Sequence, residues 1–190
     1  MKTPLYLIVA VFATLAFSPC APANLITNGD FATGDFTGWN VTHANSGSNL
    51  SVANGAAIFA ATGSGFDSIS QSFATTTGTF YSLTFDLFIS NAFQNTPDTA
   101  FQVLFNGTVI FSSPNINAPL TTLTFTNLQA IGSSTNLVFR GRRNNPGFID
   151  LDNVDVTTGV VPDTGRSALL MTIGLLGLFG FRRVLSNGSA

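Results

Sequence analysis

The segment that decides the fold reads Tyr81-Ser-Leu-Thr-Phe-Asp-Leu-Phe-Ile89. Every second residue in it is apolar, and the residues between them include Ser82, Thr84 and Asp86. In an extended strand, successive side chains point to opposite faces, so this alternation predicts a strand with one buried and one polar face. Between the two ends of the chain, no stretch has the period of roughly 3.6 residues that marks an amphipathic helix.

The flanking segments repeat the two-residue period. Phe101, Val103 and Phe105 recur at every second position, and Asn106-Gly107 separates them from another alternating run. Asn-Gly between two such runs indicates a hairpin, because both turn residues readily take positive φ. Further strands are predicted around Leu123-Thr-Phe125, Leu137-Val-Phe139 and Phe148–Val156. Many short strands at this spacing predict an all-β fold, a jelly-roll β-sandwich.

Charged residues are scarce in the middle of the chain. Residues 24–161 hold eight Asp and three Arg, and neither Glu nor Lys, which gives a net charge of 3 − 8 = −5. Such a surface does not attract nucleic acid, because phosphate binding depends on clustered Lys and Arg. The segment 24–157 is long enough for a single domain with its own core.

The first 23 residues have the order of parts of a secretory signal peptide. Lys2 precedes an apolar stretch, and Ala21 and Ala23 give an A-x-A pattern. We expect a helical signal peptide over 1–23, with cleavage after Ala23. Cys20 then leaves with the peptide, so the mature chain has no cysteine for a disulfide. Lipoprotein processing at Cys20 is the alternative, although a proline precedes it.

The chain ends with a polar motif, an uncharged apolar run and an arginine pair. Ser167–Phe181 carries no charge and is slightly shorter than the roughly 17–25 residues that span a bilayer. Arg182 and Arg183 stand where cationic side chains hold the cytoplasmic end of a membrane helix. We therefore expect a linker and motif over 158–166, a transmembrane helix over 167–183 and a cytoplasmic tail over 184–190.

This order of parts resembles the PEP-CTERM sorting signal of Gram-negative bacteria. The resemblance is to its VPDSG variant and is carried by Val161, Pro162, Asp163, Thr164 and Gly165, with Thr164 in the serine position. It implies recognition by an exosortase, a membrane-embedded thiol protease, while the C-terminal helix holds the chain in the inner membrane. The mature protein would then reside in the cell envelope or extracellular polysaccharide. The tail after the arginines is longer than is usual in the family, and a plain anchor helix is the alternative.

The two ends of the domain resemble carbohydrate-binding modules with the galactose-binding-like jelly roll. Asn24-Leu-Ile-Thr-Asn-Gly-Asp-Phe31 and the later Gly38-Trp39 resemble the family's opening, and Phe148–Val156 resembles its acidic last strand. The resemblance implies that the first and last strands lie side by side.

The same resemblance implies a structural calcium ion between the opening loop and the last strand. Calcium takes several oxygen ligands from carboxylates, carbonyls and amides. Asn28, Asp30 and Asp152 are the candidate ligands, but Ala32 stands where the family usually has Glu. Polar residues that only stabilise turns are the alternative.

Two groups of residues are candidates for contact with polysaccharide. Phe93 and Asn95 lie in a loop rich in amides, and Arg140, Arg142 and Arg143 form the only basic cluster outside the membrane segment. Arginine can bind acidic sugars through bidentate hydrogen bonds. A solvated hairpin tip is the alternative for the arginines, and the single tryptophan, Trp39, is expected in the core.

The residues give little support for catalysis. The only histidine, His43, has no signature that pairs it with a nucleophile, and the chain has no Glu. Acid–base chemistry by two carboxylates needs a pair held in a cleft. We therefore expect a non-enzymatic exported surface protein with weak glycan contact. The alternatives are a dedicated carbohydrate-binding module and, less favoured, a small jelly-roll glycan-cleaving enzyme.

Overall fold

The structure is a computed structural model that describes residues 23–44, 48–60, 65–90, 99–114, 117–143 and 147–159. The loop residues Phe93 and Asn95, the sorting motif, the arginine pair, the tail and the predicted membrane helix lie outside these ranges, as does the signal peptide as far as residue 22. Within these ranges, no helix is long and apolar enough to cross a bilayer.

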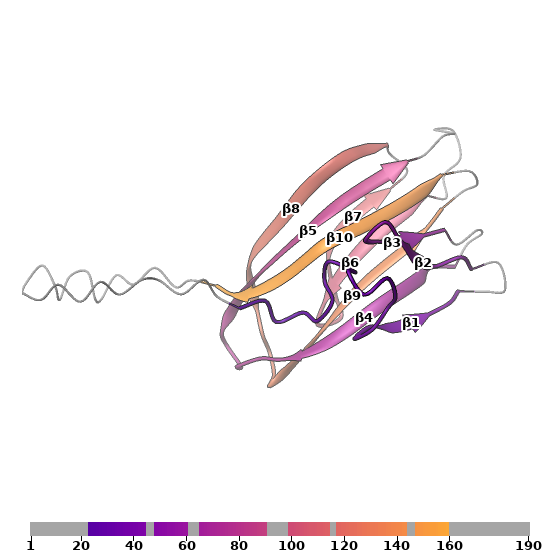
Figure 1. Cartoon of the computed structure of the whole chain (residues 1–190). Coiled ribbons are helices and arrows are strands. Elements are labelled where there is room, and N and C mark those ends of the chain that lie inside the picture. Colours follow the sequence, from indigo (N-terminus) through magenta and orange to yellow (C-terminus); the bar gives the residue numbers. More distant parts are fainter. Residues whose placement is uncertain are drawn as a thin grey trace, which may run out of the picture.

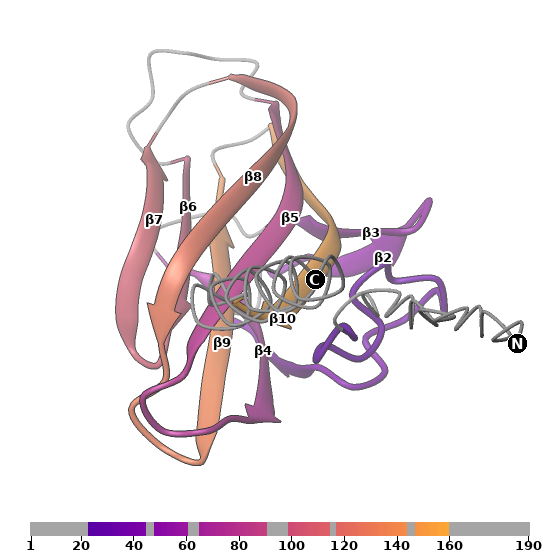
Figure 2. The same cartoon turned by 90° about the vertical axis from the view of Figure 1, so that its left-hand side faces the viewer.

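The described residues form ten strands in two five-stranded antiparallel sheets (Figures 1 and 2). Sheet A holds, in spatial order, β1 (Asn40–Thr42), β4 (Asp67–Ala74), β9 (Ser134–Arg142), β6 (Ala100–Phe105) and β7 (Thr108–Pro114). Sheet B holds β2 (Ser51–Ala53), β3 (Ala56–Phe59), β10 (Phe148–Thr158), β5 (Phe80–Ser90) and β8 (Ala118–Gln129). The predicted all-β jelly-roll sandwich is confirmed.

Phenylalanine rings fill the space between the sheets. Alternate residues of β5 from Tyr81 to Ile89 are at most 2% exposed, as the sequence period predicts. Phe85 stands at the centre of β5, with its ring centroid 5.8 Å from that of Phe125 in the same sheet and 5.2 Å from that of Phe139 in sheet A. The strand that decides the fold therefore links both layers.

The predicted hairpin turn is present at Asn106-Gly107. It joins β6 to β7, and both of its residues have positive φ, 53° and 82°. Asn54-Gly55 makes a second turn of this kind between β2 and β3, with φ values of 54° and 76°. Glycine and asparagine take this conformation at low energetic cost, which explains the Asn-Gly pairs.

The opening segment lies against the last strand, but it is a turn-rich segment rather than a strand. β3 pairs with β10 only over Ile149–Leu151. Beyond Leu151, the opening segment pairs with β10 in place of β3. Leu25 N–H donates to Val156 O, and Val154 N–H donates to Gly29 O, both at 2.8 Å. The two ends of the domain are thus side by side, as the resemblance implied (Figure 1).

The side chain of Asn24 completes this junction. Its Nδ2 donates to Val154 O at 3.0 Å, and its Oδ1 accepts from Ile26 N and Val156 N. One amide therefore satisfies three backbone groups where the opening segment meets β10.

A β-bulge interrupts β10 at the same place. The register with β5 shifts between Asp152, opposite Asp86, and Asp155, opposite Thr84, so two residues of β10 face one residue of β5. Asn153 takes a positive φ of 51° there. The extra residue turns Val154 and Val156 inward and leaves Asp150, Asp152 and Asp155 on the outer face of sheet B.

Replacing Gly29 with alanine is expected to lower the free energy of unfolding by about 2–3 kcal/mol. A Cβ at this position would overlap the carbonyl oxygen of Val154, so the opening segment would have to leave β10. Denaturant titration of the purified protein measures the change. Gly132→Ala is the matched control, because its Cβ would meet nothing nearer than Ser134 O at 3.7 Å. Equal stability of the two variants would contradict this role for Gly29.

Candidate functional site

Two arginines flank one aromatic ring on the outer face of sheet A. Cζ of Arg140 lies 5.2 Å from the centroid of the Phe66 ring, and Cζ of Arg142 lies 4.9 Å from it. Both distances are within the range of a cation–π interaction. Phe66, Gln102, Arg140 and Arg142 are called the arginine cluster below.

The strand period of β9 explains why both arginines point outward. Phe139 and Gly141, which alternate with them, are buried between the sheets. Gly141 has no room for a side chain, because a Cβ there would lie 2.9 Å from Cβ of Phe59 in the opposite sheet. The neighbouring residues 140 and 142 must therefore face away from the core.

Arg140 is held in place from the neighbouring strand. Its Nε donates to Oε1 of Gln102 at 2.7 Å, and Nε2 of Gln102 donates to Ser112 Oγ at 3.4 Å. This chain of contacts crosses β9, β6 and β7. A guanidinium anchored through Nε is pre-oriented, so less side-chain entropy is lost when its Nη groups bind a ligand.

The arginine cluster can bind an anionic, ring-shaped ligand. Arginine forms paired hydrogen bonds with a carboxylate, and an aromatic face packs against apolar C–H groups. Elsewhere on this face, Asn136 Nδ2 donates to Ser72 Oγ at 3.1 Å, so hydroxyl and amide groups also lie on the outer face of sheet A. These are the groups that hydrogen-bond sugar hydroxyls.

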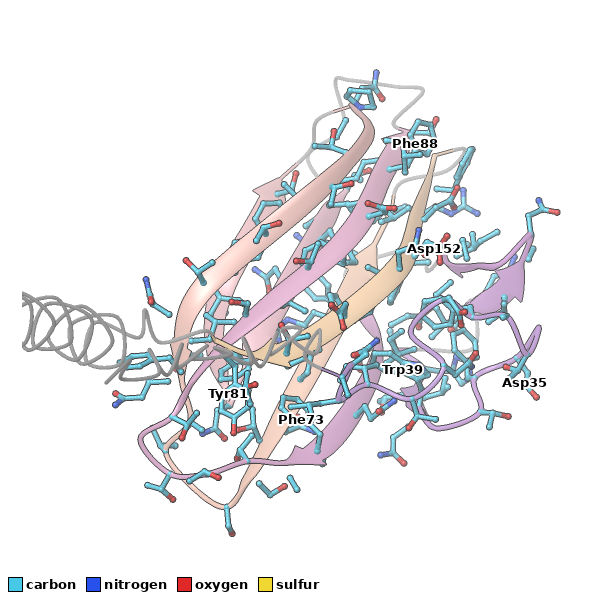
Figure 3. All side chains as sticks on the ribbon, turned by 60° about the vertical axis from the view of Figure 1, so that its left-hand side comes forward. Asp35, Trp39, Phe73, Tyr81, Phe88 and Asp152 are labelled. Carbon is cyan, nitrogen blue, oxygen red and sulfur yellow. The ribbon has the colours of Figure 1, made fainter. Side chains whose placement is uncertain are left out.

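The structure thus brings two of the three predicted arginines together and adds a ring that the sequence analysis missed. Arg143 follows β9 and is half-buried. Phe66 was missed because it precedes β4 in a glycine-rich stretch, with no alternating pattern before it. Trp39, labelled in Figure 3, is buried as expected. Its Nε1–H donates to Asn28 O at 3.0 Å.

The predicted calcium ligands are brought together only in part. The charges of Asp30 and Asp86 act on Asp152, so the three carboxylates are close enough to interact. Asn28 forms hydrogen bonds within the opening loop, where its Nδ2 donates to Asp35 O and Thr37 O. Among the described residues, no three acidic, His or Cys side chains converge to hold a metal ion. Asn28 lines the same hollow as Asp30, and calcium binding by Asn28, Asp30 and Asp152 stays a prediction.

Hydrogen bonds explain how the facing carboxylates of β5 and β10 coexist. Asp86 accepts from Thr122 Oγ1 and, at 2.8 Å, from Asn153 Nδ2. Asp152 Oδ1 accepts from Asn153 N–H at 2.6 Å. The bulge residue Asn153 therefore serves both carboxylates. A hollow of about 390 Å³ beside it is lined by the opening segment, Asn153, Val154 and Asp155.

His43 forms a hydrogen bond that the sequence did not indicate. Its Nδ1 lies 2.7 Å from Ser48 Oγ in an exposed loop. Among the described residues, no carboxylate is hydrogen-bonded to the histidine ring. A serine–histidine pair with no group to orient the ring lacks the third member of a catalytic triad.

No family model and no curated protein matches the sequence. The fold is similar to solved structures at low sequence identity. The tailspike protein 4 enzymatically active domain of bacteriophage CBA120 matches 72% of this chain with a TM-score of 0.54 and 15% identity, although the chain spans only 21% of that protein's length. The module TmCBM61, solved with β-1,4-galactotriose, matches 72% of this chain and 99% of its own, with a TM-score of 0.51 and 15% identity.

A third similar structure is the K3 adhesin domain of Lys-gingipain from Porphyromonas gingivalis. It has a TM-score of 0.51 and 15% identity, with 69% of this chain and 97% of that domain covered. At such identities the comparisons establish a shared fold, the jelly-roll β-sandwich of carbohydrate-binding modules.

The melting temperature is expected to rise as the pH is lowered from neutral toward the ordinary aspartate pKa of 3.8. Burial raises the pKa of Asp150, Asp152 and Asp155, and for Asp152 the charges of Asp86 and Asp30 raise it further. A carboxyl with a raised pKa stabilises the fold fully below its unfolded value of 3.8 and loses that contribution as the pH rises through the folded pKa. Calcium held by Asp30 and Asp152 would offset the repulsion among the carboxylates of Asp30, Asp86 and Asp152. Excess Ca²⁺ should therefore raise the melting temperature at neutral pH.

Thermal unfolding across pH, in Ca²⁺ and in chelator, measures both effects. Asp152→Asn should weaken both the pH dependence and the Ca²⁺ effect. Asp35→Asn should leave the pH dependence on the neutral side of the ordinary aspartate pKa of 3.8 unchanged. The reason is that hydrogen bonds from Thr37 and Thr33 lower the pKa of Asp35, so its contribution is lost only at more acidic pH. Equal melting temperatures in Ca²⁺ and chelator would remove the calcium site, and a melting temperature independent of pH would contradict the electrostatic argument.

Proposed function

We propose that this protein is a non-catalytic, exported module that contacts acidic polysaccharide through the outer face of sheet A. The observation that carries the proposal is the pair of guanidinium groups of Arg140 and Arg142 beside the ring of Phe66. In a domain with more aspartates than basic residues, this is a local concentration of positive charge on a polar face.

The chemistry of the cluster favours a uronic acid over a neutral sugar. The carboxylate of such a residue can accept two parallel hydrogen bonds from one arginine, while its ring packs on Phe66. The shared fold supports glycan contact, since TmCBM61 is described in complex with β-1,4-galactotriose. A dedicated module for neutral glycans is the alternative, and it would use the amides and hydroxyls of this face without the arginines.

A glycan-cleaving enzyme is disfavoured by the placement of the carboxylates. Asp86 and Asp152 face each other across β5 and β10 on the outer face of a sheet, and both oxygens of Asp86 already accept hydrogen bonds from neighbouring side chains. A general acid must instead be free to approach a substrate held in a cleft.

Export and sorting complete the proposal. The signal peptide over 1–23 would take the chain across the inner membrane, and the helix over 167–183 would hold it until an exosortase cuts near Val161–Gly165. The two ends of the folded domain are adjacent, because Leu25 pairs with Val156. Both arginines of the cluster lie on a sheet face and not at this junction, so tethering at the C-terminus is compatible with glycan contact.

Binding to polygalacturonate, with neutral galactan for comparison, tests the proposed ligand. The double change Arg140→Gln and Arg142→Gln should weaken binding to the acidic polymer by at least about tenfold, because a charge-assisted hydrogen bond contributes roughly 1.5–3 kcal/mol. Phe66→Leu should weaken it less, since an apolar surface remains. Affinity electrophoresis or calorimetry gives the measurement.

The control for this experiment is Arg143→Gln, which removes one positive charge outside the cluster and is compared with each single change, Arg140→Gln and Arg142→Gln. Thermal melting of each variant shows that the fold is intact. Equal affinity for the neutral polymer, or an equal loss from Arg143→Gln, would contradict recognition of an acidic glycan by the cluster.

Replacing Pro162 and Asp163 by alanine should leave the full-length, membrane-retained form in the native host. Proline keeps the residue before it extended, as a protease requires of a bound segment. Immunoblots of membrane and secreted fractions measure the outcome, with Ser186→Ala in the tail as the control. Secretion of the double variant at wild-type size and amount would contradict recognition of this motif.

A further inference from the structure

Two aromatic rings lie together on the outer face of sheet B, opposite to the arginine cluster. The ring centroids of Phe88 in β5 and Phe148 in β10 are 5.6 Å apart, and the planes are inclined at 46°. Phe148 is 39% exposed. Phe88 is half-buried. Large exposed apolar side chains are usually single, so an exposed ring that contacts a second ring beside a carboxylate indicates a binding surface.

The carboxylate is that of Asp150. Its cross-strand partners are Phe88 in β5 and Ile58 in β3, so it stands between apolar neighbours on the outer face of sheet B. Its Oδ1 is buried, and no hydrogen-bond partner for this atom is found in the described part of the chain. An anionic oxygen with no donor, set among apolar side chains, is a group that a cationic or hydroxyl-bearing ligand can satisfy.

The charges around this position exclude an acidic ligand. Asp86, Asp152 and Asp155 share the outer face of sheet B with Asp150. Apart from His43, the cationic side chains of the described residues are the three arginines at the end of β9. The two outer faces of the sandwich are therefore opposite in charge.

We infer that Phe88, Phe148 and Asp150 form a second binding site, for a sugar residue that carries a free amino group in a polysaccharide. The ammonium group would pair with the carboxylate of Asp150 and lie near the ring faces, which attract a cation within about 6 Å. The C–H face of the sugar would pack on the exposed ring of Phe148. Acetylation of the amine would remove the charge and with it both attractions. This site shares no residue with the arginine cluster and does not depend on it.

Calorimetry with the full-length chain in mild detergent tests the inference, with glucosamine oligomers as the probe and N-acetylated oligomers of equal length for comparison. The free-amine oligomer should bind at least about tenfold more tightly, since one tenfold step is about 1.4 kcal/mol. Asp150→Asn and Phe148→Leu should each reduce this affinity several-fold. The leucine keeps an apolar surface and removes only the ring, so the fold is preserved.

Matched charge controls separate a site from general attraction to an acidic protein. Asp155→Asn removes a charge on the same face, opposite Thr84 and about 13 Å along β5 from Phe88 at the usual rise per residue. Asp35→Asn removes an exposed charge in the opening loop, away from Phe88 (Figure 3). Both controls should bind almost as well as the wild type.

Three outcomes would overturn the inference: equal binding of the acetylated oligomer, equal losses from Asp155→Asn and Asp150→Asn, or no loss from Phe148→Leu. The double change Arg140→Gln and Arg142→Gln should leave amine binding intact. Loss of polygalacturonate binding in that variant, with retained glucosamine binding, would show that the two sites bind independently.

Discussion

The structure depends on one extra residue in the last strand. β10 lies at the centre of sheet B, where a strict two-residue alternation would place either Val154 and Val156 or Asp150 and Asp152 on the wrong face. The bulge at Asn153 resets the alternation, so all four side chains take their proper face. It also frees the backbone of Val154 to pair with the opening segment instead of with β3. Core packing, chain closure and the acidic outer face therefore follow from the same irregularity.

Residues of the core, of the opening segment and of the acidic outer face all stabilise the bulge. Asn153 accepts the positive φ that few other residues tolerate, and its side chain donates to Asp86 on β5. Asn24 binds Val154 and Val156 from the other side. Behind them, Phe31 stacks on Trp39 at 5.7 Å between centroids, and the indole donates back to the opening loop. The aspartates outside are thus fixed by contacts that continue into the core.

The sequence predicts regular strands well and irregular segments poorly. The alternation around Phe85 and the Asn106-Gly107 turn each follow from local backbone preferences, and both are found as predicted. The opening segment was expected as a strand, but its turns depend on hydrogen bonds to β10, far away in the chain. Within that segment, Nδ2 of Asn28 donates to the carbonyls of Asp35 and Thr37, contacts that no local sequence pattern indicates. Phe66 and Arg140 meet only once β4 and β9 are paired.

Packing between the two sheets also determines which positions on the outer faces can carry charged side chains. At Gly141 the two sheets approach so closely that Phe59 fills the space a side chain would need, and the residues on both sides of this glycine must turn outward. Arginine is suited to these positions, because its long side chain can cover an aromatic ring and keep its charge in water. On the other sheet, the alternation of β10, reset by the bulge, places half-buried carboxylates on the outer face. Buried apolar side chains hold both strands, so the outer residues can change charge and ligand preference with little effect on the core. One sandwich can in this way present two faces of opposite chemistry.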